Sequence, residues 1–168
     1  VQPLMRQPGS GHVVAISSVG GLVGQPFHES YCAAYCAVAG YVEGLAFYVT
    51  LAFGEDFTLV KPWSISTELA ASVMKRIEAT GGFLEDAYLP VMQRYLDGRR
   101  DQPEGVMQTC DEVAEVVLAA MVKKKPPLRL RTSSWSGAFT AVKTKANPDS
   151  ALASQPVIDQ MLGGFDRS

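Results

Sequence analysis

The stretch GHVVAISSVGGLVGQPFHESYCAAYCAVAG, residues 11–40, decides how this chain folds. It opens with a short apolar run, Gly11–Ser17, in which apolar and polar residues do not strictly alternate. Such a run is typical of a strand buried on both faces, as in a parallel sheet. A glycine-rich loop, Ser18–Pro26, follows it, and a long apolar segment begins at about Glu29. A strand, a tight loop and a helix in this order predict an α/β unit.

The long apolar segment runs from about Glu29 to Phe53 and consists mainly of Ala, Leu, Val, Tyr and Gly. A helix that is apolar on nearly every side has to be buried on nearly every side. We therefore expect it to pack against the sheet and against a partner subunit. Its longest apolar run, Ala37–Phe53, has about seventeen residues and is short for a membrane span, which favours a buried helix.

Further strands and helices follow along the chain. Thr109, with Glu112 three residues later, predicts a capping box at the start of one helix. The order strand–helix–strand–helix–helix–strand predicts an α/β fold with part of a doubly wound parallel sheet. No linker or internal repeat divides residues 1–168, so we expect a single partial domain. The predicted elements are strand Asp56–Pro62, helix Ser66–Thr80, helix 84–98 interrupted at Pro90, helix Thr109–Val122 and strand Pro127–Ser133.

Composition narrows the class of protein. Of the 168 residues, 47% are hydrophobic and 19% are charged, which is typical of a water-soluble globular domain. A formal net charge of −2 argues against nucleic acid as a partner. The 3 cysteines cannot form a disulfide framework, which favours a reducing compartment such as the cytoplasm. The N-terminal VQPLMRQPGSG has neither the apolar core of a signal peptide nor an initiating Met, so we expect the chain to begin within a longer protein.

Ser18 and Tyr31 form a candidate catalytic pair. Ser18 follows the first predicted strand, and sites in α/β sheets form at the carboxyl ends of strands. Tyr31 comes thirteen residues later, near the start of the long helix, which can bring it back beside Ser18. A phenol and a serine hydroxyl that converge on one point suit a carbonyl or alcohol substrate. The serine can donate a hydrogen bond to the substrate oxygen, and the tyrosine can give or take the proton.

The run SVGGLVGQPF from Ser18, the spacing to Tyr31 and the YCAA that Tyr31 begins resemble the active-site segment of the short-chain dehydrogenase/reductases. Within that superfamily, the chain resembles the group of retinol dehydrogenases and oestradiol 17-beta-hydroxysteroid dehydrogenases. LVKPWSISTEL, residues 59–69, resembles the strand and Pro-Gly-Pro-Val-x-Thr loop of this family. DEVAEVVLAAMVKKKPPLRLRTS, residues 111–133, resembles the last helix and strand of the group. The resemblance implies a Rossmann fold, of which this chain is the C-terminal part.

By this resemblance, Ser18 orients the substrate oxygen and Tyr31 is the acid/base residue. The loop after the second strand would close over the nicotinamide of NADP or NAD. The active-site lysine of the family stands four residues after the tyrosine, and Tyr35 occupies that position here. The implied catalytic positions are Ser18, Tyr31 and Tyr35, the implied cofactor-binding positions are Pro62, Trp63, Ser64, Ile65 and Thr67, and no metal site is implied.

Several positions depart from the family pattern. An unperturbed tyrosine has a pKa of about 10, so about one in a thousand is phenolate at pH 7. A lysine at about 4–5 Å favours the phenolate by roughly 3–4 kcal/mol, whereas Tyr35 supplies no charge. Trp63 stands where the family has a glycine that admits the cofactor, so we expect its side chain to obstruct that approach. Lys61 replaces an acidic residue usual in this group, and Ser64 replaces a proline.

The dinucleotide fingerprint of the family, Thr-Gly-x-x-x-Gly-x-Gly, is missing from the sequence. SVGGLVG, residues 18–24, has different glycine spacing and no acidic ribose ligand after it, so we expect a tight turn there. The resemblance implies an NAD(P)-dependent oxidoreductase that interconverts an alcohol and a carbonyl on a lipophilic retinoid or steroid. It also implies a homodimer in the cytoplasm, with peripheral membrane contact. The alternative is a non-catalytic fragment or pseudoenzyme with at most an interaction role.

Other residues allow two interpretations each. Cys32 and Cys36 are spaced to share a helix face as metal ligands, but a structural zinc site needs four ligands, so we expect buried small side chains. His28 either contacts a substrate or is a solvated residue at the helix start. A basic run either touches an anionic membrane or surrounds a solvated helix end. The run consists of Lys123, Lys124, Lys125, Arg129 and Arg131.

Overall fold

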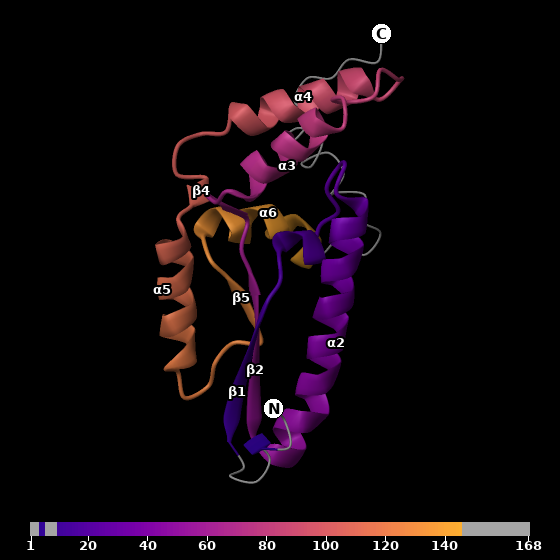
Figure 1. Cartoon of the computed structure of the whole chain (residues 1–168). Coiled ribbons are helices and arrows are strands. Elements are labelled where there is room, and N and C mark those ends of the chain that lie inside the picture. The colour runs from indigo at the N-terminus through magenta and orange to yellow at the C-terminus, as the bar shows by residue number, and fades with distance from the viewer. Residues whose placement is uncertain (1–3, 6–9, 146–168) are drawn as a thin grey trace.

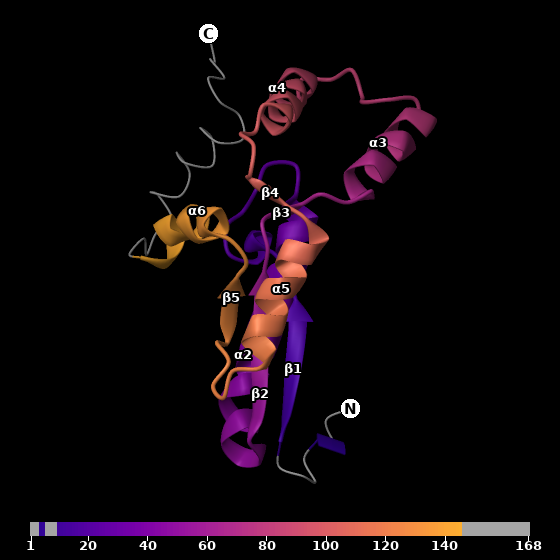
Figure 2. The same ribbon diagram turned by 90° about the vertical axis from the view of Figure 1, so that its left-hand side faces the viewer.

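The computed structural model describes residues 4–5 and 10–145 (Figure 1). It has helices on both faces of a small parallel sheet, with α2 on one side and α5 on the other (Figures 1 and 2). The predicted α/β class with parallel strands is therefore confirmed. The elements are β1 (Gly11–Ile16), the 3-10 helix η1 (Val19–Gly21), α2 (Glu29–Phe53), β2 (Glu55–Lys61), β3 (Ser64–Ile65), α3 (Leu69–Ala79), α4 (Leu89–Arg100), β4 (Met107–Gln108), α5 (Cys110–Met121), β5 (Arg129–Arg131) and α6 (Ser134–Thr144).

Capping side chains set the helix boundaries. The predicted capping box of α5 is present: the Glu112 N–H donates to Thr109 Oγ1 at 3.2 Å, and the Thr109 N–H donates to Glu112 Oε2 at 2.7 Å. Pro90 does not interrupt a helix as predicted, because it lies in the first turn of α4, where a backbone N–H is not needed. α6, which the sequence patterns do not predict as a distinct helix, begins with a second capping box between Ser133 and Ser136.

The main sheet has three parallel strands in the order β1-β2-β5. Ile16 pairs with Val60 at the carboxyl end of β1, and Leu59 pairs with Arg129 on the other edge of β2. β3 and β4 form a separate two-stranded parallel ladder. Within residues 4–5 and 10–145, β1 pairs with β2 alone, so one edge of this strand has no ladder partner.

A face of small residues packs α2 against the sheet. Ala39 and Ala46 are buried there against Phe57 and Leu59 of β2, and their short side chains let the helix approach the strand closely. In the single chain only this face of α2 lies against the sheet, so burial on nearly every side would need the partner subunit that the sequence predicts. The large exposed residues on the rest of the helix include Tyr41 (70% exposed), Phe47 (72%), Tyr48 (58%) and Leu51 (87%).

By length and composition alone, α2 is also long and apolar enough to cross a membrane. It has 25 residues and the bounds that the sequence predicts for the long apolar segment. Helices of this length and composition also occur in the cores of soluble proteins and in signal sequences. In this fold the helix ends at Gly54, whose φ of 68° is the left-handed conformation that favours glycine, and the chain turns directly into β2.

A second core lies beyond the carboxyl ends of the strands. Its buried centre consists of Val19, Trp63, Tyr95 and Val106, and Phe139 of α6 packs against it with other partly buried side chains. Figure 1 shows α6 crossing this end of the sheet, with α3 and α4 projecting beyond it. This second core therefore attaches α4 and α6 to the end of the sheet where Ser18 lies.

Two charged residues are fully buried along β2. Glu55 and Lys61 lie at its two ends, on the face that also carries Phe57 and Leu59, since alternate residues of a strand share a face. Among the described residues, neither Lys61 Nζ nor the Glu55 carboxylate oxygens have a hydrogen-bond partner. Burial lowers the pKa of the Lys61 ammonium, and the negative charge of Glu43 partly opposes that shift. Lys61 therefore destabilises the folded chain when it is protonated.

We expect Lys61→Met to raise the free energy of unfolding at pH 7 by about 1–3 kcal/mol, because it removes a buried ammonium that lacks a partner. The folded pKa of Lys61 is lowered, so the unfolded chain binds more protons between that pKa and about 10.4, and wild-type stability rises with pH in this window. Urea unfolding of both proteins from pH 7 to about pH 9.5 should therefore show that the difference between their free energies of unfolding becomes smaller as the pH rises. Lys123→Met, at an exposed lysine, is the control. A difference in free energy of unfolding between Lys61→Met and the wild type that is the same at every pH would contradict the prediction.

Candidate active site

Ser18 lies at the carboxyl end of β1, where the sequence places it. The strand ladder closes with the Ser17 N–H, which donates to the Val60 carbonyl at 2.8 Å. The chain then turns into η1, and Ser18 Oγ caps that turn by accepting from the Gly20 N–H at 3.0 Å. Ser18 is only 3% exposed, so the turn holds its hydroxyl in one place.

Two glycines let this turn touch α2. A Cβ on Gly20 would lie 3.0 Å from Cε1 of Tyr31, and a Cβ on Gly21 would lie 2.8 Å from the carbonyl oxygen of Tyr35. The second distance is shorter than real Cβ contacts, and the opposing atom belongs to backbone that cannot move aside. Gly21 is therefore needed for the loop to pack against the first turns of α2.

The same loop is unsuited to hold a phosphate. Residues 20–23 donate their N–H groups within the loop, to the Ser18 hydroxyl and to the carbonyls of Ser18 and Val19. A phosphate cradle needs N–H groups that are free to point at the ligand. SVGGLVG thus forms the tight turn that the sequence predicts, and it shapes the site by placing Ser18.

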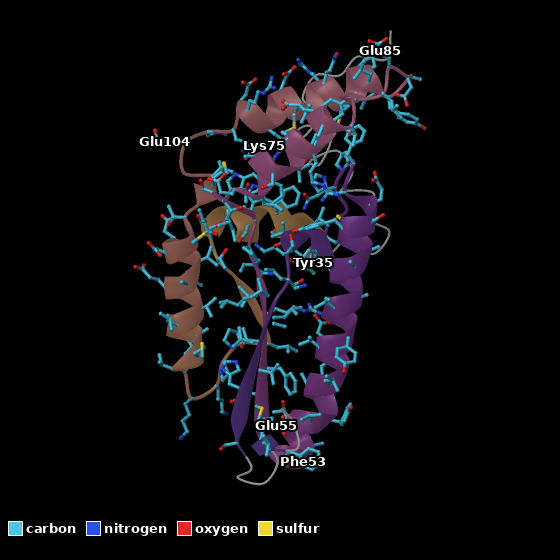
Figure 3. All side chains as sticks on the ribbon, in the orientation of Figure 1. Tyr35, Phe53, Glu55, Lys75, Glu85 and Glu104 are labelled. Atoms are coloured by element: carbon cyan, nitrogen blue, oxygen red, sulfur yellow. The ribbon has the colours of Figure 1, made fainter. Side chains whose placement is uncertain are left out.

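Tyr31 and Tyr35 lie on consecutive turns of α2, and Figure 3 shows Tyr35 near the end of the sheet that carries Ser18. Their ring centroids are 4.5 Å apart with an interplanar angle of 66°, an edge-to-face contact. The Ser18 hydroxyl interacts with the Tyr31 phenol, so the predicted pair does come together. The structure therefore unites Ser18, Tyr31 and Tyr35 in one site.

The environment of Tyr31 favours the neutral phenol. Burial raises the pKa of Tyr31 above its ordinary value of about 10, and the hydrogen bond from Ser18 partly opposes this shift. Tyr35 raises the pKa further, both through its hydrogen bond and through its own charge when ionised. At this position a lysine would have the opposite effect, because a cation stabilises the phenolate.

His28 and Tyr95 complete the walls beside Tyr31. The His28 ring meets the Tyr31 ring edge-to-face at 5.7 Å and lies 5.8 Å from the Tyr95 ring. Tyr95 comes from α4, and Phe27 packs edge-to-face against it at 5.5 Å. The sequence patterns do not single out Tyr95, because no local spacing relates a residue of α4 to the start of α2.

The sequence predicts that Trp63 obstructs the approach of the cofactor, but in the structure its ring is buried in the second core. Trp63 follows β2 after Pro62, and its ring packs into the second core at 4.4 Å from Trp135 and 4.6 Å from Phe139. Only 8% of Trp63 is exposed. Next to it, Arg99 of α4 donates to Ser64 Oγ at 3.0 Å and lies over the Trp63 ring at 5.8 Å. Trp63 and Ser64 therefore fasten the loop after β2 to α4.

The other residues of this loop, Pro62, Ile65 and Thr67, contact two different parts of the structure. The Pro62 carbonyl accepts from the Val19 N–H at 3.0 Å and so joins the loop to η1. Ile65 and Thr67 instead line a groove of about 440 Å³, together with Ile16 and one face of α5. Of the five predicted cofactor-binding positions, two thus line a groove at the end of β1. Its walls are apolar, with the Thr67 hydroxyl among the few polar groups.

The cysteines do not form a metal site. Among the described residues, no three His, Cys, Asp or Glu side chains gather closely enough to hold a metal ion. Cys32 is buried as predicted, and burial raises the pKa of its thiol. Cys36 is exposed, contrary to the prediction, because it does not belong to the face of α2 that is buried against the rest of the chain.

Comparison with known proteins supports the resemblance in the sequence. No family model matches the chain. The chain is 32% identical over 145 residues to retinol dehydrogenase 8 of Bos taurus, covering 85% of this chain and 46% of that protein. It is 38% identical over 130 residues to 17-beta-hydroxysteroid dehydrogenase type 1 of Mus musculus, covering 76% and 36% respectively. The chain thus spans about half the length, or less, of these curated relatives.

Solved structures agree on the fold. A short-chain dehydrogenase from Streptomyces avermitilis superposes with a TM-score of 0.64 at 27% identity, over 98% of this chain and 56% of that one. A short-chain dehydrogenase/reductase from Burkholderia phymatum in complex with NAD gives a TM-score of 0.61 at 20% identity, over 86% and 50%. The second likeness concerns the fold alone.

We expect Tyr35→Lys to lower the pKa of Tyr31, because it replaces a neutral phenol with a cation one helical turn away. The measurement is the alkaline ultraviolet titration of phenolate, with the Tyr31→Phe variant subtracted in each background. Tyr48→Lys, on an exposed part of the same helix, is the matched control and should leave Tyr31 unchanged. An unshifted Tyr31 in Tyr35→Lys would show that position 35 does not control its ionisation.

Proposed function

The chain belongs to the short-chain dehydrogenase/reductase superfamily, and we propose that it is the catalytic part of an NAD(P)-dependent oxidoreductase that interconverts an alcohol and a carbonyl. One observation carries this proposal: Ser18 and Tyr31, thirteen residues apart, meet at the carboxyl end of β1. This is the place where open α/β sheets bind their ligands.

The two hydroxyls have complementary roles in such a reaction. Ser18, held by η1, donates a hydrogen bond to the substrate oxygen and fixes its position. Tyr31 gives its proton to that oxygen during reduction and takes it back during oxidation. Burial and Tyr35 both raise the pKa of Tyr31, so the site stabilises the phenol, the form that donates a proton, over the phenolate.

The groove beside β1 fits the nicotinamide end of a dinucleotide. Ile16 and Ile65 supply apolar walls for a flat ring, and the Thr67 hydroxyl supplies a polar contact. When bound, the nicotinamide would supply or accept the hydride. The described residues offer no matching cradle for the phosphates, because the N–H groups of residues 20–23 are already used.

The missing phosphate site leads to the domain organisation that we propose. The chain acts as the C-terminal, catalytic half, and a dinucleotide-binding half supplies the fingerprint. The free edge of β1 supports this arrangement, because a parallel strand at that edge would continue the sheet. The length of the relatives supports it as well, since 54% of retinol dehydrogenase 8 lies outside the 46% that aligns.

The substrate class that we propose is a lipophilic alcohol or carbonyl compound, a retinoid or a steroid. The names of the two relatives support this class, and so do the aromatic walls around Tyr31. Phe27, His28 and Tyr95 pack their rings against one another there, so the environment beside Tyr31 is largely aromatic.

A specific observation also favours the alternative of a non-catalytic protein. Tyr35 removes the cation on which the family relies, and Trp63 is part of the second core rather than of a cofactor contact. A chain with these substitutions could keep the fold and lose turnover. The activity test below separates the two functions.

We expect the chain, joined to the dinucleotide-binding segment of a retinol dehydrogenase, to reduce retinal or oestrone with NADPH or NADH slowly. Tyr31→Phe should abolish this activity and Ser18→Ala should lower kcat by about a hundredfold or more, because each removes a group that acts on the substrate oxygen. Tyr48→Phe is the control for a tyrosine of α2 outside the site. Tyr35→Lys should raise alcohol oxidation, and no turnover with or without it would favour the non-catalytic alternative.

We also propose that the complete protein is a homodimer that packs through α2. The exposed aromatic residues Tyr41, Phe47 and Tyr48 support this, because soluble monomers rarely expose a large continuous apolar patch. Light scattering of the joined protein should give a mass twice that of one joined chain. Phe47→Glu should halve that mass, whereas Leu84→Glu, at an exposed apolar residue elsewhere, should not. A monomeric joined protein would contradict this proposal.

A further inference from the structure

The chain enters α2 through a tight turn formed by residues 25–28. The His28 N–H donates to the Gln25 carbonyl at 3.2 Å and closes this turn. Pro26 is the second residue of the turn, and Phe27, the third, has a φ of 60°. A proline followed by a positive φ is the pattern of a type II β-turn. The third position of such a turn ordinarily holds glycine, because a residue with a Cβ is strained there.

Phe27 is the only residue other than glycine that has a positive φ within residues 4–5 and 10–145. Left-handed backbone disfavours every side chain with a Cβ, so the chain keeps an aromatic ring here at a conformational cost. Hydrogen bonds on both sides maintain the strain. The Phe27 N–H donates to Glu29 Oε1 at 3.0 Å, and the N–H of the next residue closes the turn. Strain that the surroundings maintain in this way points to a functional position.

The turn directs two successive rings to different neighbours. The Phe27 ring reaches α4, where it meets Tyr95 edge-to-face at 5.5 Å. The His28 ring lies 5.8 Å from Tyr95 and 5.7 Å from Tyr31. The Pro26 carbonyl oxygen, 3.0 Å from His28 Nδ1, helps to orient that ring. The strained turn therefore connects the acid/base tyrosine to α4 through a series of aromatic contacts.

Exposure separates the supporting ring from the rings that a ligand can reach. Tyr95 is 7% exposed and belongs to the second core. Phe27 packs against that core but stays partly exposed, and Tyr31 is 40% exposed. Tyr95 therefore supports the Phe27 ring, while Phe27 and Tyr31 both keep part of their surface available to a ligand.

We propose that Phe27 is a specificity-determining residue, whose ring the strained turn holds as a rigid surface for the flat, apolar body of a substrate. This proposal rests on the proposed function and deepens it. The His28 ring lies between Phe27 and Tyr31, so only an extended molecule contacts Phe27 while its oxygen is at Ser18 and Tyr31. A ring that is already fixed loses little freedom when an apolar molecule packs against it. The turn thus selects substrates by their length and flatness.

Two substitutions at position 27 test the strain. Phe27→Ala and Phe27→Gly both remove the ring, but only alanine keeps the Cβ that a positive φ disfavours. In urea unfolding of the 168-residue chain, we expect the folding equilibrium constant of Phe27→Gly to be about three- to tenfold larger than that of Phe27→Ala. At Phe83, whose φ is not positive, the same pair should show the reverse order. Equal stability of the two variants at position 27 would overturn the proposal.

Two substrates of different size test the specificity. In the joined protein, we expect Phe27→Ala to raise KM for retinal about tenfold and to change kcat less than about twofold, because it removes binding surface remote from the reacting oxygen. The kcat/KM for cyclohexanone, a short ketone, should change less than about twofold.

Phe27→Tyr keeps the ring and should leave KM for retinal close to that of the wild type. Phe83→Ala is the control for an aromatic residue outside the site. An equal loss for both substrates, or a fall in kcat with KM unchanged, would overturn the proposal, because a loss of packing alone affects both substrates alike.

Retinol binding to the joined protein tests the same surface without turnover. Trp63 and Trp135, the 2 tryptophans of the chain, lie in or against the second core with Tyr95, so their fluorescence reports a ligand there. Phe27→Ala should weaken binding about tenfold, but less than about twofold in a Tyr95→Leu background, where the ring has lost its support. Equal losses in both backgrounds would overturn the proposal. If the joined protein reduces neither substrate, the proposed function fails, and this measurement still decides the role of Phe27.

Discussion

The contact between η1 and the first turns of α2 holds the site together. Gly21 faces the Tyr35 carbonyl so closely that no Cβ fits between them, and Gly20 faces the Tyr31 ring. This contact places Ser18 against Tyr31, although the two residues belong to different elements. The rest of the arrangement depends on it, because β1 ends where η1 begins and α2 is anchored along β2 by its alanine face. Any side chain larger than hydrogen at Gly21 would separate the two hydroxyls.

Electrostatics sets this site apart from the family pattern. The position four residues after Tyr31 holds a phenol, and the nearby lysine of β2 does not replace the missing cation. Lys61 is buried under α2, where it interacts with Glu43, Arg129 and Cys36. Burial therefore dominates the ionisation of Tyr31, with Ser18 as the main opposing influence. A site of this kind favours the neutral phenol of Tyr31 over the phenolate.

The second core shows how packing accommodates Trp63, at a position where the resemblance to the family implies a cofactor contact. Trp63 would be an obstacle if its ring pointed into the groove, but the ring lies in the second core beside α6. There it packs against Trp135 and Phe139. Arg99 then joins the same loop to α4 through Ser64. The loop after β2 is thus held by α4 and α6, and its last residues, Ile65 and Thr67, line the groove beside β1.

The sequence by itself determined the α/β class, most of the helix and strand positions, and the pairing of Ser18 with Tyr31. These features depend on local signals: apolar runs, the Thr109 capping box and a fixed spacing within one strand–loop–helix unit. Only the tertiary structure decided which face of α2 is buried, where Trp63 points and that Tyr95 reaches His28 from α4. Such contacts join residues far apart in the chain, and their geometry depends on how whole elements pack, which no local pattern encodes.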